Sequence, residues 1–146
     1  MFPDDKQKGF SLLELIVVLG MSSFLIALGT GIHQHLLAEA EANQFKKRLE
    51  QDILYLQQYT QFDRTAKLYL ENDRYEIYSS HLKEDLVVRS IPDGYSIKIS
   101  PNAMTFSFSP SGTALAPGSM TIETPVGRDK LVFPLGKGRG YYENNS

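Results

Sequence analysis

The sequence predicts an α+β protein in which one long N-terminal helix, transmembrane in its first half and amphipathic in its second, packs on a C-terminal antiparallel β meander. Residues 15–32 contain no Asp, Glu, Lys or Arg, which is typical of a helix in apolar surroundings. Apolar residues then recur every three or four positions as far as Tyr59, which predicts an amphipathic helix. Beyond Arg64, apolar and polar residues alternate between turn signals, which predicts strands.

The composition indicates about one domain without thiol chemistry. The chain has 146 residues and a formal net charge of −2, so its bulk charge predicts no polyanionic partner. Cysteine is absent. This excludes a disulfide framework, a thiolate metal site and a cysteine nucleophile.

The first predicted half-helix covers residues 10–32. Its 23 residues would span roughly 35 Å as a helix, enough to cross the apolar core of a bilayer. Lys6 and Lys8 precede it and favour a cytoplasmic N-terminus. One carboxylate, Glu14, lies near its start. In hydrocarbon this group would cost a few kcal/mol unless it found a partner or a proton, so the sequence predicts a role for it.

The second predicted half-helix, residues 33–64, has one apolar face that must pack on the rest of the chain. That face consists of Ala38, Ala42, Phe45, Leu49, Ile53, Leu56 and Tyr59. The charged residues lie largely off it: Glu39, Glu41, Lys46, Lys47, Arg48, Glu50 and Asp52. A solvated surface is expected for the basic run 46–48. For the basic run 46–48, contact with acidic residues of another subunit is the alternative.

The C-terminal part is predicted to form about six or seven strands. Alternating runs on either side of Asn72-Asp73 predict a hairpin. Its expected register pairs Glu71 with Arg74, Leu70 with Tyr75, and Leu68 with Ile77. Further strands are expected over residues 86–91, 95–100, 104–109, 120–124 and 130–135, between turns that contain Pro or Gly. The tail from Gly136 is expected to end in mobile residues.

Residues 8–14, Lys-Gly-Phe-Ser-Leu-Leu-Glu, resemble the class III signal of the type IV pilin and pseudopilin superfamily. The resemblance implies that a prepilin peptidase cuts after Gly9 and that the new amine of Phe10 is methylated. It also implies that Glu14 guides assembly by pairing with the free amine of a neighbouring subunit. The chain would then consist of a leader (1–9), a transmembrane and assembly half-helix (10–32), an amphipathic half-helix (33–64) and a β head (65–146).

Two plainer interpretations of the N-terminus stay open. A secretory signal peptide has a shorter apolar region, about 7–15 residues, followed by a small-residue cleavage site. Residues 27–29, Ala-Leu-Gly, could imitate that site, but Glu14 would interrupt the apolar region. A plain signal anchor needs neither Gly9 nor Glu14. Glu14 would then face water or headgroups at a helix N-terminus, which tolerates acids.

Two further stretches resemble particular pseudopilins. The pattern Phe106-x-Phe108-x-Pro110-x-Gly112, with residues 118–122 and 130–139 after it, is similar to the C-terminal pattern of the H-type minor pseudopilins. Residues 49–58 resemble the competence minor pseudopilins of Gram-positive bacteria, the ComGD type.

These resemblances imply a minor pseudopilin of a competence (transformation) pilus that takes part in DNA uptake. The implied partners are other major and minor pseudopilins, the prepilin peptidase and the cytoplasmic membrane, with DNA as a further one. The implied location is the cytoplasmic membrane, single-pass with the N-terminus inside, and then a filament at the cell surface. A subunit of a type II secretion or type IV pilus system, and a membrane-anchored binding module that never polymerises, are the alternatives.

Signals for catalysis, metals and cofactors are weak, so we expect no enzyme, no metal and no cofactor. His33 and His35 are two positions apart on a predicted helix and would point to different sides. His81 stands alone, and no Ser-His-Asp set, HExxH or EF-hand loop occurs. Residues 135–140 resemble a phosphate loop only faintly, since the spacing is wrong and no helix is expected after them.

One patch is a candidate for contact with DNA. The end of the head carries a local excess of basic residues, followed by two tyrosines, and this combination suits charge and stacking contacts with a single strand. The basic residues are Arg128, Lys130, Lys137 and Arg139. Asp129 and Glu143 dilute the patch, and a solvated head surface is the commoner interpretation.

Overall fold

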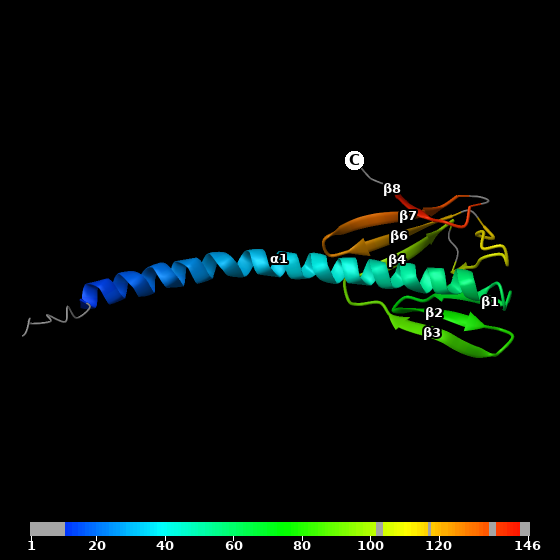
Figure 1. Ribbon diagram of the computed structural model, residues 1–146, viewed down its shortest axis with the longest axis horizontal. Helices are drawn as coiled ribbons and strands as arrows, with labels where there is room; N and C mark the ends of the chain where they lie inside the picture. Colours follow the sequence, from blue (N-terminus) through cyan, green and yellow to red (C-terminus); the bar gives the residue numbers. More distant parts are fainter. Residues whose placement is uncertain (1–10, 102–103, 117, 135–136, 144–146) are drawn as a thin grey trace, which may run out of the picture. The chain divides into compact units, whose positions relative to one another are not determined.

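The computed structural model describes residues 11–101, 104–116, 118–134 and 137–143, apart from the side chains of residues 28–34. The chain divides into two compact units, Met1–Ala38 and Glu39–Ser146. Helix α1 (Leu12–Tyr59) contributes to both units, and the described strands belong to the second (Figure 1). The predicted α+β class is therefore confirmed.

In the first unit, α1 leaves large apolar side chains open on all of its sides. Phe24 and Ile26, for example, are 65% and 69% exposed. Among the described residues, none of the helices combines the length and the apolar character that a membrane crossing requires. The transmembrane assignment of residues 10–32 stays a prediction.

The second unit contains two four-stranded antiparallel sheets. One has the strand order β3-β2-β1-β5, with β1 (Ala66–Leu70), β2 (Arg74–Ser79), β3 (Glu84–Ser90) and β5 (Thr105–Phe106). The other has the order β4-β6-β7-β8, with β4 (Ser96–Ser100), β6 (Gly118–Thr124), β7 (Gly127–Phe133) and β8 (Tyr141–Glu143). Figure 1 shows the second half of α1 running between β2 and β3 on one side and β4, β6 and β7 on the other.

One core joins the helix to both sheets. Leu49, Ile53 and Leu56 of α1 are at most 4% exposed. They belong to one buried cluster with Leu68, Tyr75, Ile77, Ile97, Ile99, Phe106, Phe108, Met120, Ile122, Leu131 and Phe133. The predicted apolar helix face is confirmed, and burial of this face is the main source of stability for a helix of this kind.

The predicted hairpin is confirmed in its register. Leu68 lies opposite Ile77 and Leu70 lies opposite Tyr75. The guanidinium Nε of Arg74 is 2.8 Å from the carboxylate of Glu71, as the charge pattern predicts. The register holds because a shift by one residue would turn the apolar side chains away from the core.

The strands form two sheets, and some of them pair with strands that are not their neighbours in sequence. β5 is only two residues long and pairs with β1, so β4 pairs with β6 rather than with its neighbour in sequence. The tail contains a strand that was not predicted, since β8 pairs with β7. All three residues of β8 are exposed. The segment therefore lacks the apolar alternation by which a strand is recognised in a sequence.

Candidate functional site

The hydrogen bonds of Ser11 define the start of helix α1. The backbone N–H of Leu13 donates to Ser11 Oγ at 3.3 Å, and the N–H of Leu15 donates to the Ser11 carbonyl at 3.1 Å. Ser11 is thus the N-cap of α1. Glu14 follows three positions later, in the first turn, and completes a Ser-x-x-Glu capping sequence. Gly9 and Phe10, the predicted cleavage and methylation positions, lie outside the described residues.

Glu14 is exposed at this helix start, and no described side chain pairs with it. Its carboxylate lies at the positive end of the helix dipole. An exposed apolar surface follows it, formed by Leu12, Leu13, Leu15, Ile16, Val17, Val18, Leu19, Met21, Phe24, Leu25 and Ile26. The group therefore has a favourable helix position but no counter-ion within the described chain.

The two hydroxyl groups in this apolar stretch are satisfied within the helix. Ser22 Oγ donates to the carbonyl of Val18, and Ser23 Oγ donates to the carbonyl of Leu19, both at 2.8 Å. Such back-bonding removes the need for water at a helical serine. The described surface of residues 12–26 consequently suits an apolar surrounding, with Glu14 as its one ionisable group.

Two of the four basic residues predicted for DNA contact are paired within the head. Arg128 Nη2 is 2.5 Å from Glu123 Oε1, and Lys130 Nζ is 2.6 Å from Glu143 Oε2. Glu123 also accepts a hydrogen bond from Lys98, which together with one from Ser96 lowers its pKa to about 2. Of the two acids expected to dilute the patch, Glu143 pairs with Lys130, whereas Asp129 pairs with Lys46 outside the patch.

Lys137 and Arg139 are exposed, and no acid in the described chain lies within ion-pair distance of either. The glycine-rich segment that carries them is seated on α1. Gln57 Nε2 donates to the carbonyls of Gly112 and Gly138, at 2.5 and 2.7 Å. A Cβ on Gly138 would come within 2.5 Å of the Gly112 carbonyl oxygen. The glycine permits close packing here, and the faint resemblance to a phosphate loop finds no support in this arrangement.

Gln57 was missed at the sequence level. Its amide side chain follows the apolar positions Ile53 and Leu56, which is the signal that could have indicated a polar contact to the head. Only the fold brings Gly112 and Gly138, which are distant in sequence, to the same amide group.

Asp52, which the sequence pattern places off the apolar helix face, is buried. It is 6% exposed, and its Oδ2 accepts hydrogen bonds from Tyr75 Oη at 2.8 Å and from Arg89 Nε at 3.1 Å. Burial and the bond to Asp52 raise the pKa of Tyr75 well above its usual range. Lys46 is also drawn in, with Nζ 3.0 Å from Asp129 Oδ2. The helix carries these charges on the flanks of its apolar face, where both sheets reach them.

Metal-binding geometry is absent from the described residues, where no three His, Cys, Asp or Glu side chains gather. His81 lies in the turn after β2, and its backbone N–H donates to Thr65 Oγ1 at 2.9 Å. His35 lies on α1, and the side chain of His33 is outside the description.

Comparison with known proteins gives one match, and it falls on the N-terminal segment. Residues 4–30 match the family described as the prokaryotic N-terminal methylation motif. This motif is the signal of type IV pilins and pseudopilins, so the match supports a place in that broad superfamily. It implies a membrane-anchored precursor that is processed by a prepilin peptidase. Neither the search of curated proteins nor that of solved structures gives a match.

Proposed function

We propose that the protein is a minor pseudopilin, a structural subunit of a competence (transformation) pilus that takes part in DNA uptake across the cell envelope. The observation that carries the proposal is the methylation motif over residues 4–30, combined with a capped, apolar helix start whose one carboxylate has no partner in the described chain. The H-type pattern of the head and the ComGD-like residues 49–58 support the subtype.

The proposed mechanism couples processing to assembly. Gly9 has no side chain and so leaves the backbone open to the peptidase. Before cleavage Phe10 is an ordinary amide, and after cleavage it carries a cationic amine. A carboxylate in lipid is costly unless it is paired, so Glu14 of one subunit would bind the amine of another. Only a processed subunit offers that cation.

The apolar helix surface would form the contact between subunits. It is open along residues 12–26, and this chain supplies nothing in the described structure to cover it. In a membrane, lipid tails would surround it, and in a filament the helices of neighbouring subunits would replace the lipid. The protein would thus move from the cytoplasmic membrane to a filament at the cell surface without refolding its head.

We propose a structural rather than an enzymatic role for the head, without metal or cofactor. Contact with DNA remains a hypothesis that rests on Lys137 and Arg139, because Arg128 and Lys130 are paired with acids. It predicts a DNA affinity that falls steeply with salt and falls further in a Lys137→Ala/Arg139→Ala variant. Equal binding by that variant would remove the patch from consideration.

The second candidate is a membrane-anchored module that binds a ligand and never polymerises; minor subunits of secretion or type IV pilus systems are related alternatives. Determination of the mature N-terminus and intact mass separates the first two functions. A chain that begins at Phe10, with one added methyl group, supports the pseudopilin. A functional protein that retains Met1, or begins near Thr30, contradicts it.

The role of Glu14 has its own test. We expect Glu14→Ala to be cleaved after Gly9 as before, because the carboxylate is not part of the bond that is cut. Its recovery in sheared filaments should fall about tenfold or more, since the pairing with the neighbouring amine is lost. Asp93→Ala, which removes an exposed carboxylate from the head, is the matched control. Normal co-assembly of Glu14→Ala would refute the role.

A further inference from the structure

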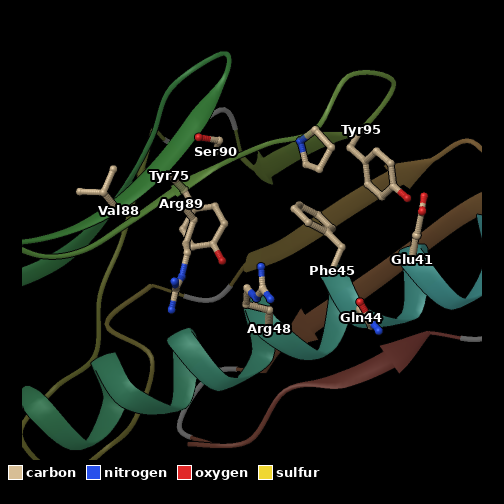
Figure 2. Close-up of a pocket in the computed structure, with 10 residues that line it drawn as sticks. Glu41, Gln44, Phe45, Arg48, Tyr75, Val88, Arg89, Ser90 and Tyr95 are labelled. Atoms are coloured by element: carbon tan, nitrogen blue, oxygen red, sulfur yellow. The ribbon is translucent and has the colours of Figure 1, made fainter.

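A hollow of about 400 Å³ lies in the second unit beside α1, lined from the helix, from β2 and β3, and from the segment that leads into β4 (Figure 2). The helix contributes Glu41, Phe45 and Arg48, and β3 contributes Val88 and Arg89. The described functional features of the N-terminus do not involve this hollow. Its lining is basic at one end, apolar in the middle and acidic at the other end, and this distribution indicates what it would bind.

One end of the hollow has more positive than negative charge. Arg48 and Asp52 have the four-residue spacing at which helical ion pairs form. Asp52 is instead occupied by Tyr75 and Arg89, with Arg89 Nε at 3.1 Å and Nη2 at 3.4 Å from its two oxygens. Arg48 is exposed and forms no ion pair or hydrogen bond with another described residue.

The guanidinium groups of Arg48 and Arg89 both affect the ionisation of Tyr75. Arg48 and Arg89 line the hollow together with Tyr75, whose hydroxyl group donates to the same Asp52 oxygen that Arg89 binds. Burial and Asp52 raise the pKa of Tyr75, and the two guanidinium groups act in the opposite direction. Figure 2 shows Arg48 rising from the helix toward Tyr75 and Arg89 on the facing strands. Asp52 is paired with Arg89, so Arg48 keeps a positive charge that a carboxylate from outside would balance.

The middle of the hollow is apolar. The rings of Phe45 and Tyr95 pack edge to face with centroids 5.1 Å apart, and Pro92 lines the same wall. Val88 of β3 lines the hollow on the side of Arg89 and is 50% exposed (Figure 2). At the opposite end Glu41 lies seven residues before Arg48, or about 10 Å along the helix. An occupant would therefore place its carboxylate at Arg48 and an apolar neighbour against Phe45 and Tyr95, because Glu41 repels an anion at the other end.

We propose that this hollow is a docking site for an acidic side chain, with an apolar residue beside it, presented by a neighbouring pilin-like subunit. Arg48 would bind the incoming carboxylate, and Arg89, already fixed by Asp52, would add its positive field. The identity of the partner class rests on the proposed function. The charge and shape of the hollow do not depend on it.

The test places a photo-crosslinking residue, p-benzoylphenylalanine, at Val88 of the full-length protein in its native cells. Adducts are identified by mass spectrometry. We expect adducts with another pilin-like subunit, at a peptide that contains Asp or Glu next to an apolar residue. Arg48→Glu should lower the adduct yield about fivefold or more, because it places an anion against an anion. Replacing the mapped acid of the partner by Lys should restore the yield in the Arg48→Glu background.

Lys47→Glu is the matched control, since it makes the same change of charge at an exposed helical position outside this hollow; it should leave the yield unchanged. Thermal unfolding should be the same for wild type and Arg48→Glu. If Arg48→Glu unfolds, Arg48→Gln replaces it in the comparison. Equal yields for wild type and the Arg48 variant, or adducts only with proteins that are not pilin-like, overturn the docking site. N-terminal sequencing of the same samples tests the proposed function separately from the docking site. Failure of the proposed function would show as a retained leader.

Discussion

Two carboxylates of helix α1, Glu14 and Asp52, have opposite surroundings. Glu14 is exposed in the first turn, among apolar side chains that this chain leaves uncovered, and no described residue pairs with it. Asp52 is 6% exposed and is held by Tyr75 and Arg89. A carboxylate needs compensation wherever water is removed. Asp52 obtains that compensation within the chain, whereas Glu14 has no such partner among the described residues.

The same contrast holds for apolar surface. Leu49 is 1% exposed within the head, whereas Leu19 is 59% exposed in the first unit. The first half therefore exposes its apolar side chains, whereas the second half is part of the core of the head. Substitutions in the two halves of the helix should therefore differ in their effect on the stability of the head.

Leu49→Ala should destabilise the head by about 2–5 kcal/mol, because it opens a cavity in the core. Leu19→Ala makes the identical chemical change in the first half and should leave unfolding of the head within about 0.5 kcal/mol of wild type. Denaturant unfolding of the full-length protein in detergent, followed by tyrosine fluorescence, measures both. Equal effects of the two substitutions would contradict the division of the helix into two roles.

Asp52→Ala should cost about 2–4 kcal/mol, because it leaves the Tyr75 hydroxyl without its acceptor and Arg89 without its counter-ion. Asp93→Ala removes an exposed head carboxylate and is the control for the loss of one negative charge. The same unfolding experiment compares them. A loss below about 0.5 kcal/mol for Asp52→Ala would show that the buried network does not stabilise the head.

Gly138→Ala tests how tightly the second half of the helix holds the C-terminal segment. The new Cβ would lie 2.5 Å from the Gly112 carbonyl oxygen and 2.8 Å from Gln57 Nε2, so the segment must shift, at a cost of about 1–3 kcal/mol. Gly127→Ala is the control, since nothing lies within 4 Å of its Cβ position. Hydrogen exchange at residues 137–143 reads out the loosening. Unchanged exchange in Gly138→Ala would contradict the close packing.

The smallest effect concerns pH. Hydrogen bonds from Lys98 and Ser96 lower the pKa of Glu123 from 4.5 to about 2. Because the folded-state pKa is the lower one, Glu123 stabilises the fold above its unfolded pKa, and this contribution is lost as the pH falls from about 4.5 to 2. Lys98 is exposed and Glu123 is only half-buried, so salt should weaken their interaction and the pH effect. Glu123→Gln should flatten the pH dependence of unfolding in this window, and an unchanged slope would contradict it.

Elements of the fold that depend on local pattern can be predicted from the sequence. The spacing of Leu49, Ile53 and Leu56 predicts the buried helix face, because a helix repeats every 3.6 residues. Alternation around Asn72-Asp73 predicts the first hairpin and its register, because neighbouring strands joined by a tight turn have few other ways to pair. The signal over residues 8–14 is also a local pattern, and the motif match confirms it.

Contacts between distant parts of the chain are visible only in the tertiary structure. β5 pairs with β1 rather than with its neighbours in sequence, and β8 adds to β7 although its residues show no alternation. Asp52 is buried because Tyr75 and Arg89 reach it from two strands, and Gln57 binds two glycine carbonyls from separate loops. Local spacing sets which face a side chain occupies, but the partner that meets it there is chosen by long-range packing, which no short window of sequence contains.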